Sequence, residues 1–122
     1  MKLHLASNAG ANQFTGYGDG YVEINKTRHD GSVLVTIDSI TAWPVENVDA
    51  LADTDFDQIL AANPEVVLLG TGPTLQFPHP RLYKALTARQ IGVEVMDTNA
   101  ACRTFNILMS EGRRVVAAIL HR

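Results

Sequence analysis

Two short loops in this sequence combine residue types that suit the binding of a small anion. One follows the apolar run 65–69, the other follows the apolar segment 93–96, and together they contribute Gly70, Thr71, Gly72, Asp97 and Thr98. Ligands of open α/β sheets bind outside the carboxyl ends of the strands, and the free N–H groups of a helix N-terminus favour an anion. The spacing predicts a shallow pocket between the loops. Alternatively, the glycines only permit a tight strand exit and Thr98 caps its helix.

The helix expected after these loops carries three more side chains whose types suit binding or reaction. Cys102 lies one turn into it, where a thiolate would gain from the N-terminal dipole, yet it shares a face with apolar residues and buried cysteines usually act as small apolar groups. Arg103 lies on the opposite face beside Asn99 and Asn106. This arginine flanked by amides would bind a carboxylate or phosphate, or it is a surface residue tied to local carbonyls.

No complete catalytic or metal-binding pattern is present. The four histidines lack metal-ligand spacing, and the acids at 53, 55 and 57 lack the glycine and glutamate of a calcium loop. The glycine-rich stretch 16–20 precedes a predicted strand, whereas a phosphate loop follows one. We therefore expect no catalytic residues, no metal and no cofactor, and a non-enzymatic role is favoured.

Hydrophobic periodicity predicts the elements that must position these residues. Strands are expected at 21–28 and 32–37, joined by a hairpin turn at Asp30-Gly31, with a third extended segment at 41–44 anchored by Trp43. A helix begins with a capping signature of Thr54 and Asp57, and a second helix covers 80–90. Buried strands are expected at 65–69, 93–96 and 115–120, and a third helix runs from 97 or 98 to Gly112.

Alternating strands and helices indicate parallel pairing with right-handed crossovers. The prediction is one α/β domain over residues 1–122, with three layers, a mostly parallel central sheet, flanking helices and an added N-terminal antiparallel hairpin. In the third helix, one arc is expected to face the core; it contains Ala101, Cys102, Phe105, Leu108 and Met109.

Composition narrows the class of protein. The net charge of −3 argues against nucleic-acid binding, and no apolar stretch is long enough for membrane insertion. A single cysteine fits a reducing compartment, and the N-terminus lacks a signal peptide, so a cytoplasmic location is expected. Charged residues make up only 19% of the chain, which favours docking to a protein partner or self-association as a homodimer.

Several segments together resemble one known family: 68–72, 92–98, 100–108, the turn Glu111-Gly112-Arg113 and 116–118. This is the largely uncharacterised family that includes the mitochondrial NADH dehydrogenase (complex I) assembly factor 3 proteins and an animal protein linked to adipocyte differentiation. The resemblance implies a three-layer α/β fold with an added hairpin and a role in assembling a respiratory complex. It adds Glu111 and Arg113 to the candidate site residues.

The absence of an Arg- and Ser-rich transit segment suggests a bacterial or processed chain. The leading hypothesis is a non-enzymatic assembly factor whose partners are respiratory-complex subunits or other assembly factors. The rival hypothesis is a binder or enzyme for a small anion, using the loops 70–72 and 97–103.

Overall fold

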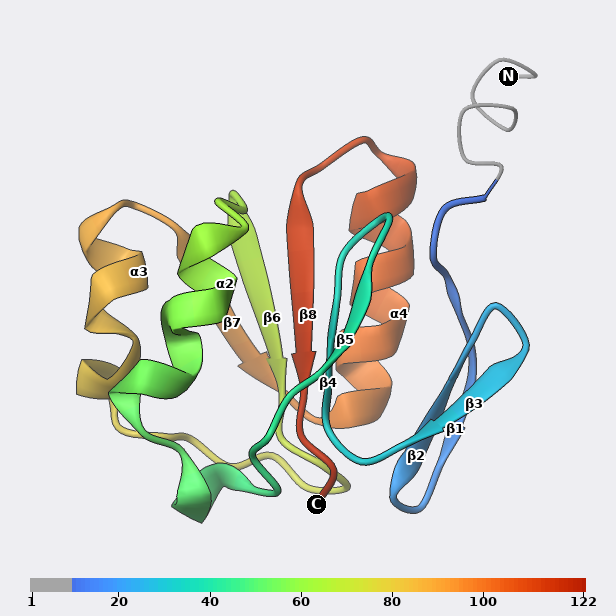
Figure 1. The fold of residues 1–122 in the computed structure, drawn as a ribbon, viewed down its shortest axis with the longest axis horizontal. Helices are drawn as coiled ribbons and strands as arrows, with labels where there is room; N and C mark the ends of the chain where they lie inside the picture. The colour runs from blue at the N-terminus through green and yellow to red at the C-terminus, as the bar shows by residue number, and fades with distance from the viewer. Residues whose placement is uncertain (1–9) are drawn as a thin grey trace.

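The computed structural model describes residues 10–122 and contains two β-sheets (Figure 1). Residues 1–9 lie outside the described part of the chain. They include His4 and most of the N-terminal segment in which no signal peptide was expected. The smaller sheet has the order β1-β2-β3, with β1 at Phe14–Gly18, β2 at Tyr21–Ile24 and β3 at Thr27–Asp30. The larger sheet has the order β5-β4-β8-β6-β7. Its strands are β4 (Val33–Val35), β5 (Ile40–Ala42), β6 (Val66–Gly70), β7 (Gly92–Met96) and β8 (Val115–Ile119).

The larger sheet is mixed, which corrects the expected mostly parallel arrangement. β6 pairs in parallel with β7 and β8, whereas β4 pairs antiparallel with both β8 and β5. The central strands β6 and β8 are buried along their whole length, as their uninterrupted apolar runs predict. β7 was expected to be equally buried, but it is half-exposed because it lies at the edge of the sheet.

The N-terminal hairpin lies earlier than predicted. The stretch 21–28 contains two strands, and the turn between β2 and β3 is at Asn25 and Lys26, with φ of 53° and 70°. Two successive positive φ values are the signature of a type I′ turn, whose twist suits a hairpin. The turn at Asp30-Gly31 instead carries the chain from the small sheet into β4. β1, which includes part of the glycine-rich stretch 16–20, forms the third strand of this sheet.

The long helix α4, Thr98–Ser110, follows the prediction closely. Its N-cap is Asp97, whose Oδ1 accepts a hydrogen bond from the Ala100 N–H at 2.9 Å. Four of the five residues expected to face the core are buried, and Leu108 is partly buried against the same core cluster.

The other helices are short. A 3₁₀ turn η2 (Asp53–Phe56) leads into α2 (Asp57–Ala61), and η3 (Pro80–Tyr83) leads into α3 (Lys84–Ala88). A further turn, η1, spans Val48–Ala50. The predicted capping residues are wrong. The capping carboxylate belongs to Asp55, not Asp57, and it accepts a hydrogen bond from the Ala52 N–H at 2.8 Å. The η2–α2 segment therefore begins at Asp53.

Helices cover both faces of the larger sheet (Figure 1). Successive strand residues point to opposite faces, so Leu68 packs with α4 and β1 while Val67 and Leu69 pack with α2 and α3. On the α2–α3 face, Trp43 is the anchor that the sequence predicted. It is buried, donates from Nε1 to the Asp55 carbonyl at 3.0 Å, and meets Phe56 edge to face at 6.0 Å.

Candidate functional site

The structure brings the two predicted loops together at the carboxyl ends of β6 and β7. Gly70 ends β6 where α4 crosses the strand closely: a Cβ there would lie 2.9 Å from Ile119 Cδ1 and 3.3 Å from Thr98 Cα. Gly72 has φ of +88°, a conformation that other residues adopt only with strain. Packing therefore requires glycine at position 70, and the backbone conformation of the turn requires glycine at position 72.

The polar groups of these loops bind one another. The Gly72 N–H donates to Thr98 Oγ1 at 3.0 Å, and the Thr98 N–H donates to the Gly72 carbonyl at 2.9 Å. The Thr71 N–H donates to the Met96 carbonyl at 2.9 Å, and Asp97 caps α4. The pair of loops thus forms a closed junction, in line with the alternative of tight strand exits and helix capping.

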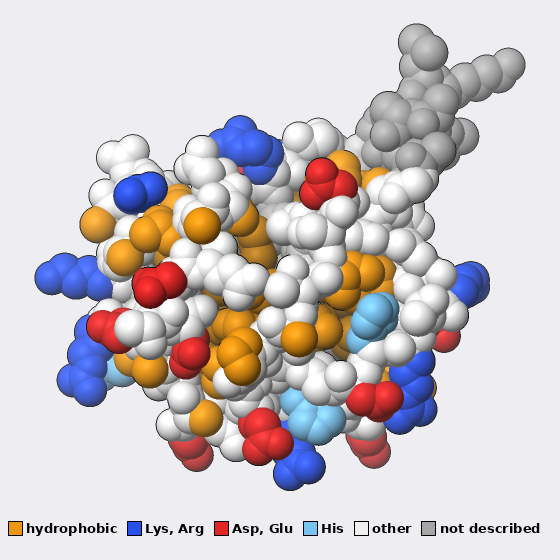
Figure 2. All heavy atoms as spheres, in the orientation of Figure 1, with side chains coloured by type: hydrophobic (Ala, Val, Ile, Leu, Met, Phe, Trp, Pro, Cys, Tyr) orange, Lys and Arg blue, Asp and Glu red, His pale blue; other side chains and the backbone are white. Residues whose placement is uncertain are grey.

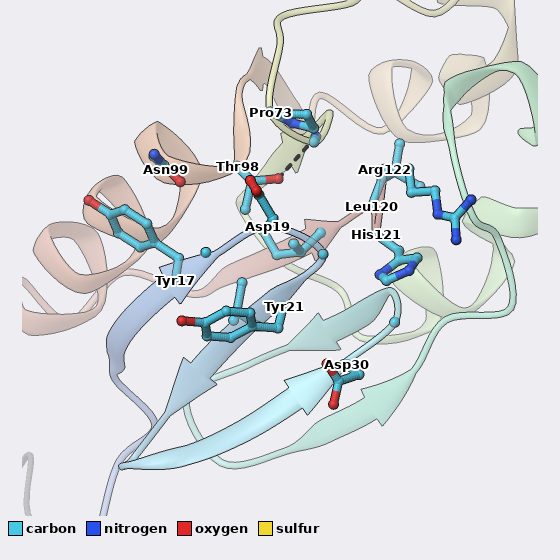
Figure 3. A pocket seen from close by; sticks show the side chains of 16 residues that line it. Tyr17, Asp19, Tyr21, Asp30, Pro73, Thr98, Asn99, Leu120, His121 and Arg122 are labelled. Atoms are coloured by element: carbon cyan, nitrogen blue, oxygen red, sulfur yellow. Dashed lines mark hydrogen bonds between the residues drawn. The ribbon is translucent and has the colours of Figure 1, made fainter.

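A cavity of about 660 Å³ lies directly beside this junction (Figure 3). Gly72, Thr98 and Asn99 form one wall, and the turn between β1 and β2 forms the opposite wall. Residues 119–122, at the end of β8 and after it, also line the cavity. The other lining groups include the side chains of Tyr17, Asp19, Tyr21, Asp30, His121 and Arg122. Of the residues predicted for a site, this cavity contains Gly72 and Thr98 but not Arg103.

His121 was not predicted as part of any site, because it belongs to no motif. Its backbone N–H donates to Ser32 Oγ at 2.6 Å, which fixes the chain after β8. Its Nδ1 is buried without a hydrogen-bond partner among the described residues. Gly20 leaves room for the imidazole, since a Cβ at Gly20 would lie 3.2 Å from Cε1.

The charges around this cavity are mixed. The charged residues that line it are Asp19, Asp30 and Arg122. Asp30 is also paired with Arg28 at 2.9 Å, and Arg28 lies 4.0 Å from the centre of the Tyr21 ring.

Cys102, Arg103 and Asn106 border a second hollow of about 350 Å³ between β1 and α4. Both polar atoms of the Asn106 side chain are engaged, because Oδ1 accepts from the Phe14 N–H at 2.9 Å and Nδ2 donates to the Phe14 carbonyl at 2.8 Å. Arg103 Nη1 donates to the Tyr17 hydroxyl at 3.2 Å. These two side chains hold the small sheet against α4.

Cys102 is buried in the core between α4 and the sheet. Burial raises the pKa of its thiol to about 12, against a small opposing effect of the Arg103 charge. The thiol is therefore protonated at neutral pH, and its surroundings match the packing interpretation.

Glu111 and Arg113 lie at the other end of the parallel strands, away from the cavity. Gly112, with φ of +80°, ends α4 between them. The Arg113 Nε contacts Glu65 Oε2 at 3.1 Å, and the Arg114 N–H donates to Glu65 Oε1 at 2.9 Å. The hydrogen bond from Arg114 is the main cause that lowers the pKa of Glu65, followed by Arg113. This cluster joins the start of β8 to the start of β6.

Within residues 10–122, no group of three or more histidine, cysteine or acidic side chains is arranged to hold a metal ion. Over the same residues, no helix has the length and hydrophobicity needed to cross a membrane.

Comparison with solved structures supports the fold. A protein from Bordetella parapertussis is 41% identical, with a TM-score of 0.85 over 93% of this chain and 98% of that chain. A Bordetella pertussis protein described as a Mth938-like domain is 35% identical, with a TM-score of 0.79 over 90% of this chain and 85% of that chain. A more distant structure named MT938 is 19% identical with a TM-score of 0.66 over 91% of this chain and 98% of that chain, which shows a shared fold only.

Curated relatives match most of the sequence. The bovine protein "NADH dehydrogenase [ubiquinone] 1 alpha subcomplex assembly factor 3" is 34% identical over 83% of this chain and 55% of its own length. An uncharacterized protein of Rhodobacter capsulatus is 33% identical over 92% of this chain and 86% of its own. The chain spans about half the length of the assembly factors that it matches. The profile of the family described as "Protein of unknown function (DUF498/DUF598)" matches residues 14–120, and the chain belongs to that family.

Proposed function

We propose that this chain is a single-domain, non-enzymatic protein-interaction factor that assists the assembly of a larger complex, with a respiratory enzyme as the leading candidate. The observation that carries the proposal is the similarity to the assembly factor 3 proteins. The bovine and human members are 34% and 33% identical to this chain over 83% and 80% of its length. The similarity therefore extends over most of this fold.

The candidate site residues also support a structural role. Gly72 is hydrogen-bonded to Thr98, and Asn106 is hydrogen-bonded to the backbone of Phe14. Cys102 is a core residue whose thiol is protonated. Polar side chains engaged in this way hold elements together and are not poised to act on a substrate. A protein with such a scaffold would act through its surface.

The test is affinity purification of the tagged protein from its native cells, after cross-linking, with mass spectrometry of the recovered proteins. Repeated recovery of subunits or assembly factors of a respiratory enzyme is the expected result. Recovery of the tagged protein alone, from both the aqueous and the membrane fraction, would contradict the proposal. We further propose a cytoplasmic location in a bacterial cell, which the same fractionation tests.

The cavity beside Thr98 favours a second candidate function, the binding of a small polar molecule. Its position at the carboxyl ends of β6 and β8 is where α/β sheets bind ligands. A screen of polar metabolites by thermal unfolding tests it, because a ligand at 100 times its Kd adds about 2.7 kcal/mol to the free energy of unfolding. The replacement Asn99→Trp would fill the cavity and should abolish any shift that arises there.

A further inference from the structure

The loop between β6 and η3, residues 73–79, exposes two large apolar side chains. Phe77 is 73% exposed and Leu75 is 50% exposed, and Phe77 is the most exposed large hydrophobic residue in the described part of the chain. Scattered single apolar residues on a surface are ordinary. Two of them on one short loop, one of them a phenylalanine with most of its surface exposed, form a candidate anchor for a partner.

This loop is attached to the fold near both of its ends. Thr71 is completely buried, and its hydroxyl donates to the Thr74 carbonyl at 2.7 Å and accepts from the Gln76 N–H at 3.1 Å. Pro78 is buried directly beside Phe77. A loop fixed before binding loses little conformational entropy when its exposed side chains are covered. The fold thus presents Leu75 and Phe77 in a preorganised form.

The segment that follows the loop is basic. Between residues 66 and 93 the sequence has Arg81, Lys84 and Arg89 but no aspartate or glutamate. None of these three cations forms an ion pair within residues 10–122. Arg81 and Lys84 lie in η3 and at the start of α3, four and seven residues after Phe77. Their unpaired charge is complementary to carboxylates on a partner.

The neighbouring elements argue for a protein rather than a lipid surface. η2 packs against η3 through Phe56 and Tyr83, whose ring centres are 6.0 Å apart, and η2 carries Asp53 and Asp55. Figure 2 shows acidic side chains over the α2 region and Lys and Arg side chains along the margin where α3 lies. An anionic lipid surface would repel those acids, whereas a protein can match a face of mixed charge.

We propose that the loop with Leu75 and Phe77, together with Arg81 and Lys84, is the docking surface of this protein. Its occupant is a segment of a different protein in which apolar side chains are flanked by Asp and Glu. The two apolar side chains enter the partner, and the two cations pair with its carboxylates. This inference rests on the proposed function and assigns that function a location.

The test places a photo-cross-linking residue, p-benzoylphenylalanine, at position 77 in the native cells. The matched control carries it at Ile107, which is 57% exposed on α4, on the other side of the sheet. Mass spectrometry should map cross-links from position 77 to an acidic and apolar segment of another protein. The combined change Arg81→Glu and Lys84→Glu should reduce them at least tenfold. Cross-links only to lipid, to a second copy of this chain or to a basic segment would overturn the proposal, as would equal cross-linking from position 107.

Purification with the Phe77→Ser variant separates this inference from the proposed function. Because the side chain is exposed, the variant should fold like the natural protein, which circular dichroism checks. If the natural protein recovers a partner and Phe77→Ser recovers at least tenfold less, the surface is supported. If both recover the partner equally, the surface is wrong and the proposed function stands. If the natural protein recovers no partner, the proposed function fails and the docking surface fails with it.

Discussion

The two faces of the larger sheet are covered in different ways. On one face, the 13-residue helix α4 carries a single charged side chain, Arg103, and packs with the small sheet through Phe105 and Phe14 at 5.3 Å. On the other face, α2 and α3 have five residues each and carry one charged side chain each, and the adjoining turns η2 and η3 add Asp53, Asp55 and Arg81. The first face joins the two sheets through buried side chains, although Ile107 and Arg103 of α4 remain exposed, whereas the second face is bordered by more charged side chains and by the exposed Leu75 and Phe77. Stability and recognition are therefore expected to depend on different faces.

The replacement Phe105→Ala should have the largest effect on stability. The ring is fully buried and contacts Phe14 edge to face, so its removal leaves a cavity in the core. The free energy of unfolding should fall by about 3–5 kcal/mol, which urea denaturation measures. Phe77→Ala is the matched control on the other face. Equal losses for the two variants would contradict the comparison.

The replacement Asn106→Ala should cost about 2–3 kcal/mol, because it leaves the N–H and the carbonyl of Phe14 without partners in a partly buried position. Amide hydrogen exchange should show faster exchange in β1 and leave β6 protected. Asn99→Ala, at an exposed position of the same helix, is the control and should leave exchange in β1 unchanged. Normal protection of β1 in Asn106→Ala would show that the hydrogen bonds between Asn106 and Phe14 are not needed to hold β1.

Cys102 should make stability depend on pH in the alkaline range. Burial raises the pKa of the folded thiol from 9.0 to about 12, so between these values the folded state holds a proton that the unfolded state has lost. Stability should therefore fall as the pH rises from about 9 towards 12, by up to about 1.4 kcal/mol per pH unit. Thermal melts compare the natural protein with Cys102→Ala, whose curve should be less steep. Rapid labelling of the native thiol at pH 8 would show that the thiol is accessible, against this account.

The replacement Thr71→Val keeps the shape of the side chain and removes its hydroxyl. Stability should fall by about 1 kcal/mol, because the freed groups of Thr74 and Gln76 lie at the surface and can bind water. The Gln76 amide should exchange faster, and cross-linking from position 77 should become less specific. Thr87→Val, at an exposed position of α3, is the control. An unchanged Gln76 amide would mean that the loop is held by other contacts.

Phe77→Ser should have the smallest effect on stability, within about 0.5 kcal/mol of the natural protein, because an exposed surface side chain contributes little to folding. Its effect on partner recovery should nevertheless be large. Chemical denaturation together with the purification described above measures both. A stability loss of several kcal/mol would show that the ring packs against the fold.

The elements with uninterrupted apolar runs or strong helical periodicity were predictable from the sequence. β6, β8 and α4 were expected within one or two residues, because each is long and its burial pattern repeats. The first hairpin was misplaced because Asp30-Gly31 is a stronger turn signal than Asn25-Lys26. The actual turn needs a lysine at φ of 70°, which local preferences do not suggest.

The surroundings of the candidate site could not be predicted from the sequence, because they depend on contacts between residues far apart in the chain. Asn106 was expected to be available for a ligand, but it meets Phe14, 92 residues away in the chain. The cavity joins residues 17–22 to residues 119–122, and its shape follows from how the two sheets pack. The sequence did indicate correctly that the loops at 70–72 and 97–98 lie together, because parallel strands end at the same edge of a sheet.

The two hydrogen bonds between Asn106 and Phe14 affect how the small sheet can pair with other chains. β1 is an edge strand, and the unpaired backbone of an edge strand is a template for pairing with a strand of another molecule. At Phe14 the amide of Asn106 occupies both backbone groups as a neighbouring strand would. A single side chain thus closes the start of an edge that would otherwise be open to aggregation.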